Sequence, residues 1–519
     1  MDDQPRREFI RRMYAVGAAG AIAARAKVGS AAEVPHAGGG GEWPLSAAER
    51  AAAVTPQTLQ FEPGDVRRYG ADPSGARDST QALIDANSVG THEGGSIRIP
   101  SGKYLYAPTN TLNIAVSWSG DGAHETFILC DTSKFTGEFF RIVGSTEIRD
   151  LLIKATGPKA GTGVRLAPVS AGEFTGEARL TRLWVVGFNY NIQCDNNFEV
   201  TFDQVRSQLG NEGFHCAPDT SKGNGYATTH LHLNCYYAQN ARNVFYSPSI
   251  RYAFRTITFM GGAIEGATGG TCQASFTRCS PLKLIQVYFE AAGTIPALVL
   301  KECVAGIDGA YLGGTGGIEV DASTRIELRQ VLAVAASDVF HREDGAGSVS
   351  MQDCSWPASG NTLGTAGVTL RNTSINGTMY RDCSPESTSL GAIRFSRQTT
   401  LIEKNGAQDV YRFLNIAGRA IGGSICGRFE ILAKNEGDPV DQVVYEYWVG
   451  YTWGDPEHAS LVPLQRLARR TDVGVSVAPL SLAEDGEGPG VKLQFSKNPE
   501  IERVRVDVLF QGLTYSDSA

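Results

Sequence analysis

The stretch from Thr258 to Leu312 constrains the fold of this chain more than any other, because similar strand-like runs recur along it. Two columns of apolar residues repeat, with offsets of 25 and 22 residues. The columns are Met260, Ile285 and Ile307, and then Ile264, Phe289 and Tyr311. A near-constant period in this range predicts a solenoid, in which each repeat buries its apolar face only against its neighbours.

Short β-rich runs continue the pattern from Thr111 to about Leu390, separated by turns of Gly, Asn, Asp and Ser. The chain holds 60 glycines among 519 residues, above the usual share of about 7%, which suits a fold with many tight turns. Two longer steps, Gly210–Thr229 and Ala238–Thr256, predict loops on this scaffold, and such loops are often functional. The chain is therefore expected to be all-β.

The segment before the repeats gives the fold its most specific signature. Asp65 to Ala86 predicts a strand, a Pro/Gly turn and a helix capped by Asp78 or Ser79, and Gly94 to Tyr104 adds a strand and a Pro-x-Gly turn. This segment resembles the opening of the pectate-lyase-like superfamily, which includes polygalacturonase relatives and phage tailspike depolymerases. The resemblance implies a right-handed parallel β-helix, a pectin-lyase-like solenoid, capped by that helix. The superfamily contains lyases and hydrolases, so the resemblance leaves the reaction open.

Around Ser396 the repeat fades, and longer runs with period-2 alternation follow. Such alternation between Gly/Pro/Asp turns predicts an antiparallel sandwich. We therefore expect a parallel β-helix domain over residues 61–396 and a C-terminal β-sandwich over 397–519. The second domain is similar in appearance to C-terminal β-domains of tailspike-like proteins, which implies a homotrimer or glycan binding; a plain capping role is the alternative.

The N-terminus has the pattern of an export signal. Arg6-Arg7 with Phe9 precedes an apolar run from Met13 to Ala24 and small residues at Ala24-Arg25-Ala26. It resembles a bacterial twin-arginine signal, which exports folded proteins. The run is shorter than the roughly 20 residues that span a bilayer. We expect a signal peptide over residues 1–32 and a linker over 33–60. The mature protein is expected to have no membrane span and to be located in the periplasm or outside the cell.

The charge and the cysteine content limit the kinds of ligand and cofactor that the protein is expected to bind. A net charge of −8 and a pI near 5.6 argue against nucleic-acid binding, which needs a basic face. The ten cysteines form no CxxC pair, so a zinc site is not expected. We expect most of the cysteines to be buried free thiols that pack as small hydrophobic side chains. The sequence lacks the complete motif set of polygalacturonases and the Asp cluster of the pectate-lyase calcium site. No cofactor is expected, and Ca²⁺ has no ligand cluster to support it.

A carboxylate pair is the first candidate for chemistry. In the aligned repeats Glu265 and Glu290 are vertical neighbours, about one strand spacing of 4.8 Å apart, and Asp308 follows one coil later. Glycoside hydrolysis needs one carboxylic acid for the leaving oxygen and a second carboxylate that attacks or activates water. Crowding two like charges raises one pKa, as a general acid requires. The competing interpretation is exposed residues at strand ends.

A basic and aromatic group is the second candidate. Between Asn240 and Phe289 five cations oppose Glu265, a local charge of +5 − 1 = +4. The cations are Arg242, Arg251, Arg255, Arg278 and Lys283. A positive patch on a negative protein would select a polyanion. We expect substrate contacts from Arg251, Arg255, Arg278, Lys283, Tyr237 and Tyr288.

The same region offers a different reaction. His230 and His232 share one strand face, opposite Leu231 and Leu233. With Tyr236 they could supply acid and base for β-elimination from a uronate, while Arg255 or Lys283 neutralises the carboxylate. The competing interpretation is a solvated rung of polar side chains.

The sequence thus predicts an exported enzyme that cleaves a polysaccharide, expected to be acidic, in a groove on the β-helix. Hydrolysis by Glu265 and Glu290 is favoured over β-elimination by the His/Tyr/Arg set. A glycan-binding or surface-structural β-helix without catalysis is the rival function.

Overall fold

The structure is a computed structural model. It describes residues 42–170, 175–217, 227–247, 254–269, 272–290, 295–313, 316–333, 338–342, 348–356, 368–375, 378–388, 391–403, 409–412, 423–435, 442–452, 455–469, 475–477, 490–495 and 503–516. Beyond residue 374 only the backbone is described. The predicted signal peptide (1–32) lies outside the described residues.

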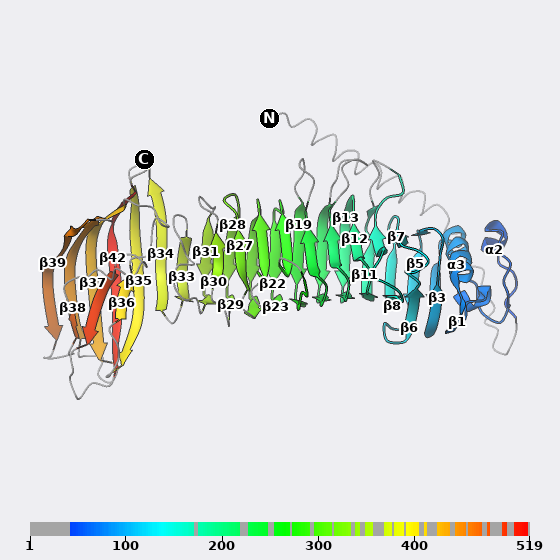
Figure 1. Ribbon diagram of the computed structural model, residues 1–519, viewed down its shortest axis with the longest axis horizontal. Helices are drawn as coiled ribbons and strands as arrows, with labels where there is room; N and C mark the ends of the chain where they lie inside the picture. Colours follow the sequence, from blue (N-terminus) through cyan, green and yellow to red (C-terminus); the bar gives the residue numbers. More distant parts are fainter. Residues whose placement is uncertain are drawn as a thin grey trace, which may run out of the picture.

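The N-terminal end of the solenoid is closed by the predicted helix. The cap consists of the 3₁₀ helix η1 (Val66–Tyr69), β1 (Ser74–Asp78) and α3 (Thr80–Glu93), at one end of the elongated molecule in Figure 1. Ser79 is the N-cap residue of α3, one of the two residues expected there. The predicted helix and the strand after it are confirmed, but the segment expected to form the first strand is η1, and β1 begins at Ser74, within the predicted Pro/Gly turn.

Residues 42–60, where the sequence predicted a linker, pack on this cap. They include the short helix α2 (Ala47–Ala51), whose capping box pairs Ser46 with Glu49. Glu49 forms a fully buried ion pair with Arg68 of η1 at 2.5 Å, and Arg68 also donates to the carbonyl of Phe61 at 2.7 Å. Because a buried charge must be paired, this ion pair ties the segment to the end of the solenoid.

The body is a parallel β-solenoid, as predicted, whose coils each contribute strands to three walls. Walls 1 and 2 belong to one large sheet, and wall 3 is a separate sheet, with ten strands among the described residues. Wall 1 comprises β2 (Ser96–Ile99), β5 (Ser117–Gly120), β13 (Asn197–Asp203), β16 (Ala227–Leu233), β19 (Arg255–Met260), β22 (Leu282–Ile285), β25 (Val304–Asp308), β28 (Arg325–Arg329) and β31 (Val349–Gln352), with β10 (Thr175–Gly176) beside β13. Wall 2 comprises β3 (Gly102–Tyr106), β6 (Thr126–Cys130), β14 (Arg206–Gln208), β17 (Tyr236–Ala238), β20 (Ala263–Glu265), β23 (Tyr288–Glu290), β26 (Tyr311–Gly313), β29 (Leu332–Ala333) and β32 (Ser355–Trp356). Three longer strands contribute to both walls: β8 (Glu147–Ala155), β11 (Arg179–Val186) and β33 (Val368–Ile375).

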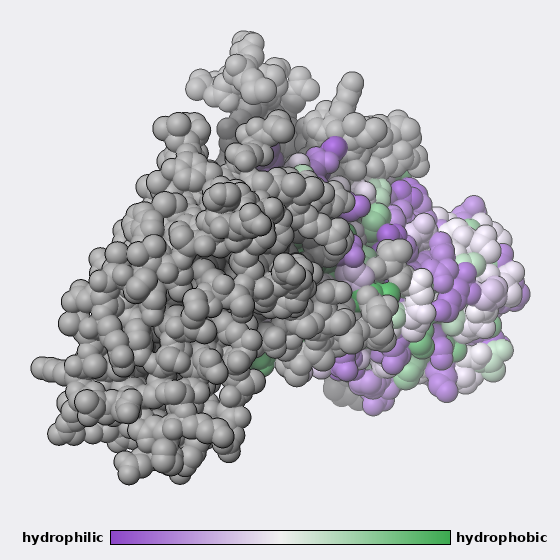
Figure 2. Space-filling view, turned by 60° about the vertical axis from the view of Figure 1, so that its left-hand side comes forward, coloured by the Kyte–Doolittle hydropathy of each residue, from purple (hydrophilic) through white to green (hydrophobic). Residues whose placement is uncertain are grey.

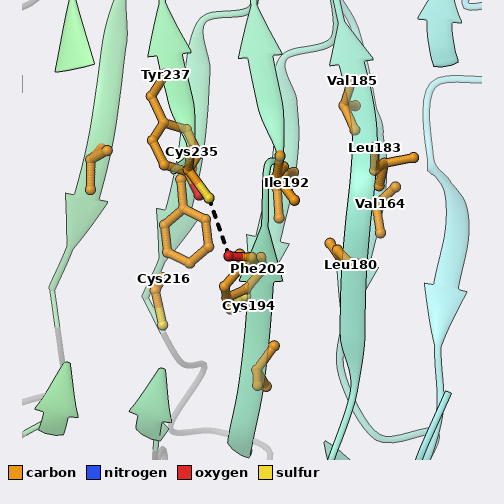
Figure 3. Close-up of a cluster of buried hydrophobic side chains, with 14 of the residues drawn as sticks. Val164, Leu180, Leu183, Val185, Ile192, Cys194, Phe202, Cys216, Cys235 and Tyr237 are labelled. Atoms are coloured by element: carbon orange, nitrogen blue, oxygen red, sulfur yellow. Dashed lines mark hydrogen bonds between the residues drawn. The ribbon is translucent and has the colours of Figure 1, made fainter. Parts of the chain in front are cut away.

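Wall 3 faces the same core from the other side of the coil. Its strands are β4 (Leu112–Ile114), β7 (Glu138–Ile142), β9 (Thr162–Leu166), β12 (Tyr190–Cys194), β15 (Glu212–Cys216), β18 (Arg242–Tyr246), β21 (Ala274–Thr277), β24 (Leu298–Lys301), β27 (Gly316–Val320) and β30 (Asp338–Arg342). Inward residues of successive coils stack in register, as in Leu180, Phe202, His232, Phe259, Leu284 and Ile307 of wall 1. Figure 3 shows part of this core, where the Cys235 thiol donates to the Phe202 carbonyl at 3.3 Å.

A residue with positive φ joins wall 1 to wall 2 in each of nine successive coils, from that of β8 to that of β31 and β32. Its values lie between 46° and 67° in Asp150, Arg182, Gln204, Asn234, Gly261, Gln286, Gly309, Gln330 and Asp353. Each turn is held by the next coil; the Asn234 amide, for example, donates to the Met260 carbonyl at 2.8 Å. Gly262, which follows Gly261, has φ +80°, and a Cβ there would lie 2.1 Å from the Cys235 carbonyl oxygen. Only glycine fits this position without backbone movement.

The register corrects the alignment predicted for the third repeat. Met260 pairs with Ile285, as expected, but Ile285 pairs with Asp308, and Phe289 pairs with Leu312. The second offset is thus 23 residues, because 308 − 285 = 23. The sequence alignment placed Ile285 in one column with Ile307 because an apolar side chain is usually an inward one, but Ile285 faces outward.

Antiparallel pairing begins at β34 (Thr378–Thr388), before the predicted domain start at 397. The following strands extend the large sheet at the end opposite the cap in Figure 1: β35 (Gly391–Glu403), β42 (Arg503–Ser516), β37 (Gly423–Asn435), β38 (Gln442–Thr452) and β39 (Asp455–Arg469). A small separate sheet contains β36 (Asp409–Arg412), β41 (Gly490–Phe495) and β40 (Val475–Val477). The antiparallel strands follow the predicted period-2 runs, and their assembly into a sandwich stays a prediction.

Other described features bear on the sequence analysis. The eight cysteines whose side chains are described are all buried, as predicted. In the part of the chain that the structure describes, no helix is long and apolar enough to cross a membrane. In the coloured part of Figure 2, hydrophilic and hydrophobic residues are interspersed on the surface.

Candidate functional site

Wall 2 carries a continuous outward column that is rich in aromatic side chains. Its members are register partners on successive coils: Trp184, Arg206, Tyr236, Ala263, Tyr288 and Tyr311. The rings of Tyr288 and Tyr311 stack with centroids 4.9 Å apart and planes within 4°. Parallel strands held in register place these side chains along the long axis of the solenoid, about 4.8 Å apart per coil.

A groove of about 900 Å³ runs beside the first part of this column. We call it the wall 2 groove. It is lined by residues of six coils: Gly122, Ala123, His124, Asp150, Arg182, Leu183, Trp184, Gln204, Arg206, Gln208, Asn234, Cys235, Tyr236, Gly262 and Ala263. A surface that combines aromatic rings with a few polar groups is what a ligand with apolar and hydroxylated faces requires.

Trp184 is the centre of the aromatic part of the groove. The His124 ring meets it edge-on with centroids 5.6 Å apart, and the Arg206 guanidinium lies 5.9 Å from its centroid. An arginine over an indole face is attracted by the ring quadrupole, which holds the cation beside the ring. These contacts position Trp184 from both sides.

The turn column contributes an ion pair to the groove. Arg182 and Asp150 are the positive-φ residues of adjacent coils, and the guanidinium binds the carboxylate in a bidentate manner at 2.5 and 2.8 Å. The hydrogen bond to Asp150 is the main cause that raises the pKa of Arg182. The charge of Arg182 is thus compensated within the groove.

The predicted carboxylate pair lies directly beyond the groove. Glu265 and Glu290 are register partners on β20 and β23, as expected, and both side chains point outward. The hydroxyl of Tyr236, which lines the groove, donates a short hydrogen bond to Glu265, and the Tyr288 hydroxyl donates to Glu290 at 2.7 Å. The hydrogen bond to Glu265, followed by burial, raises the pKa of Tyr236 to about 12. The bond to Glu290 raises the pKa of Tyr288 to about 12 as well. Both phenols therefore stay protonated donors at neutral pH.

Asp308 does not join this pair. It ends β25 on wall 1 and pairs with Ile285, while the register partner of Glu290 is Gly313. Asp308 precedes the turn residue Gly309 and so lies on wall 1, whereas Glu265 and Glu290 lie on wall 2. The structure forms a column of two carboxylates and not of three.

The two histidines predicted for β-elimination are buried. His230 and His232 are 1% and 0% exposed, and it is Leu231 and Leu233 that face outward. His232 is sandwiched between Phe202 and Phe259, with centroids 4.5 and 3.9 Å away. Neither imidazole can reach a substrate, so their predicted catalytic role is wrong.

The interior satisfies these imidazoles with hydrogen bonds. His230 bonds to the Tyr246 hydroxyl at 3.0 Å and the Asn197 amide oxygen at 2.5 Å. His232 bonds to the hydroxyls of Tyr237 and Tyr246 at 2.7 and 2.8 Å. Burial lowers the pKa of His230 to about 3 and that of His232 well below its usual value. Both rings are neutral parts of the core.

The predicted basic patch is only partly formed. Arg242 is bound by Glu212 at 2.8 Å, and Arg278 by Glu302 at 2.7 and 3.1 Å. Arg255 and Lys283 are exposed on wall 1. Arg251 lies outside the described residues.

The two predicted tyrosine contacts have different fates. Tyr237 is fully buried and cannot contact substrate, which corrects that prediction. Tyr288 faces outward within the aromatic column. Among the described residues, no group of three or more His, Cys, Asp or Glu is placed to hold a metal ion.

Sequence reasoning missed Trp184, Arg206 and His124. They are distant in sequence, and the register alone brings them together. A signal was present, because the residues two positions after the turn residues Arg182, Gln204 and Asn234 are not buried and face outward on wall 2. Aligning the coils on Arg182, Gln204 and Asn234 places Trp184, Arg206 and Tyr236 in one column.

Comparisons with known proteins add structural neighbours only. No model of a known protein family and no curated protein matches the sequence. Among solved structures, the enzymatically active domain of tailspike protein 2 of bacteriophage CBA120 is 12% identical, with a TM-score of 0.47, covering 89% of this chain and 80% of that chain. ORF18 of Geobacillus virus E2 is 13% identical, with a TM-score of 0.46 and coverages of 81% and 80%. The catalytic unit of a GH87 alpha-1,3-glucanase from Streptomyces thermodiastaticus is 13% identical, with a TM-score of 0.45 and coverages of 62% and 65%.

Proposed function

We propose that this chain hydrolyses glycosidic bonds of a polysaccharide that lies along wall 2, with Glu265 and Glu290 as the catalytic pair. The observation that carries the proposal is their placement on one column of adjacent coils, between two sets of aromatic rings. Trp184 and Tyr236 precede the pair along the axis, and Tyr288 and Tyr311 lie level with its end and beyond it. The apolar faces of sugar rings pack against such aromatic surfaces.

The spacing of the pair favours a retaining mechanism. Residues in register on adjacent strands are about 4.8 Å apart, close to the carboxyl separation of about 5–5.5 Å in retaining glycosidases. One carboxyl group would protonate the leaving oxygen while the other attacks the anomeric carbon. The phenols of Tyr236 and Tyr288 hold the two carboxylates in place by hydrogen bonds.

β-Elimination is the weaker alternative. With His230 and His232 in the core, Tyr236 is the only proposed base left on the surface, and Arg255 and Lys283 the only proposed cations with a described position. A phenol with a pKa of about 12 that donates to a carboxylate is a poor base at neutral pH. These observations favour hydrolysis.

The decisive experiment is to incubate the purified protein with acidic and neutral polysaccharides and measure reducing ends together with ultraviolet absorbance. Hydrolysis gives reducing ends without the absorbance of an unsaturated uronate, and elimination gives both. Retention of an oligosaccharide without any cleavage would replace the enzymatic proposal with the glycan-binding one.

We also propose export by the twin-arginine pathway to the periplasm or beyond. The motif at Arg6-Arg7 supports it, and seven buried free thiols among the described residues suit a protein that folds in a reducing compartment before export. Replacing Arg6 and Arg7 by lysine should leave the protein in the cytoplasm; unchanged export would contradict the proposal. The homotrimer stays a prediction, to be checked by light scattering, where a monomer mass would refute it.

A further inference from the structure

We propose that Arg206 binds an acidic group of the polysaccharide in the wall 2 groove, at a fixed distance from the bond that is cleaved. This inference rests on the proposed function and adds the chemical class of the substrate and the register in which it binds. The geometry of the groove, rather than overall charge, carries the inference.

Arg206 has the placement of a recognition residue. It is exposed on β14, between the register partners Trp184 and Tyr236, and it lines the groove. Its guanidinium lies beside the Trp184 ring, and the described residues supply it with no carboxylate partner. A planar guanidinium presents a fork of donors that matches a carboxylate, sulfate or phosphate group.

The other charged groups around the groove are already engaged. Arg182 and Asp150 neutralise each other in a bidentate pair. Glu265, beyond the groove, accepts from the Tyr236 hydroxyl. His124 is exposed and lies edge-on to Trp184. In the described part of the groove, Arg206 is therefore the permanent cation whose charge is left for a ligand.

The position of Arg206 fixes where the acidic group sits relative to the chemistry. Arg206 precedes Glu265 by two coils and Glu290 by three. At about 4.8 Å per coil, the guanidinium is roughly 12 Å along the axis from the middle of the carboxylate pair. That distance exceeds one sugar ring, so the acidic sugar lies away from the scissile bond. Cleavage of a polymer with regularly spaced acidic sugars should then give fragments with the acidic sugar at a constant place from the new end.

The test uses the purified full-length chain and hexasaccharides of polygalacturonate, alginate and hyaluronan. Each hexasaccharide is compared with the same molecule after its carboxyl groups are reduced to alcohols. Dissociation constants are measured by calorimetry for the wild type, Arg206→Gln and Arg206→Lys. The matched control is Arg325→Gln, which removes an exposed arginine on wall 1, outside the groove.

The wild type should bind at least one acidic hexasaccharide and bind its reduced form more weakly. Loss of the charge-assisted hydrogen bonds should weaken acidic binding by Arg206→Gln about tenfold or more, with partial rescue in Arg206→Lys. Arg206→Gln and the wild type should bind the reduced form equally, and Arg325→Gln should behave as the wild type.

Three results would overturn the inference: no acidic hexasaccharide bound by the wild type, equal affinity for acidic and reduced forms, or unchanged acidic binding by Arg206→Gln. Cleavage of a neutral or reduced polymer by the wild type, measured as reducing ends, would leave the proposed hydrolysis standing in each case. Loss of cleavage on every polymer, with Arg206-dependent binding intact, would instead remove the hydrolysis and keep the acidic site.

Discussion

Replacing His232 by phenylalanine should make the protein less stable at neutral pH and make its stability fall less steeply on acidification. The phenylalanine ring can keep the stack between Phe202 and Phe259. The Tyr237 hydroxyl loses its hydrogen bond to His232, whereas the Tyr246 hydroxyl keeps its bond to His230. An unsatisfied buried hydroxyl costs about 1–3 kcal/mol. At about pH 7.5 we therefore expect the free energy of unfolding of the variant to be about 2 kcal/mol lower than that of the wild type.

The sign of the pH dependence follows from the direction of the shift. Burial, reinforced by His230, lowers the pKa of His232 in the folded state well below its usual value. Below about pH 6.5 His232 binds a proton in the unfolded chain but stays neutral in the folded chain. The free energy of unfolding of the wild type therefore falls by about 1.4 kcal/mol for each pH unit of acidification. The variant lacks this loss. The difference of about 2 kcal/mol should therefore shrink on acidification and vanish near about pH 5.

Urea unfolding followed by circular dichroism between neutral and acidic pH measures this difference. His92→Gln is the control, because it removes an exposed histidine at the end of α3, outside the core of the solenoid. A wild-type and a His232→Phe curve that stay parallel across the acidic range would refute the assignment of His232 as a neutral core residue.

Two further substitutions test the scaffold and the site. Gly262→Ala should destabilise the fold by several kcal/mol, since its Cβ would lie 2.1 Å from the Cys235 carbonyl oxygen. Gly306→Ala is the control and should have little effect, because a Cβ there has no heavy atom within 4 Å. Equal melting temperatures of the two variants would contradict the turn geometry. Tyr236→Phe should lower kcat about tenfold by releasing Glu265 from its hydrogen bond, with the melting temperature nearly unchanged, and an unaltered kcat would show that Tyr236 does not position the carboxylate.

The fold was largely predictable from the sequence, because its rules are local. The cap motif specified α3, and the repeated apolar positions specified stacked strands with Glu265 above Glu290. These features depend on turn chemistry and on side-chain period, which neighbouring residues encode.

The errors arose where polarity alone does not decide which way a side chain faces. His230 and His232 occupy inward positions because Phe202 and Phe259 above and below fix the register, and partners from other strands satisfy their nitrogens. Ile285 faces outward although it is apolar, and this moved Asp308 by one position in the alignment. Such assignments depend on adjacent coils, which a single strand does not reveal.

The groove was missed for a related reason. Trp184, Arg206 and Tyr236 are separated by steps of 22 and 30 residues, because the second step includes a longer connection. Without the positive-φ residues as anchors, unequal steps hide a column that is regular in space.

The central claim is that Glu265 and Glu290 cleave a glycosidic bond, and single-turnover release of reducing ends by Glu265→Gln and Glu290→Gln tests it most directly. Each variant should be slower than the wild type by about 10²–10⁴-fold, while Asp308→Asn, which changes a carboxylate on wall 1, should react at the wild-type rate. Wild-type rates in both glutamine variants, or a rise in unsaturated uronate that matches the reducing ends, would contradict the account.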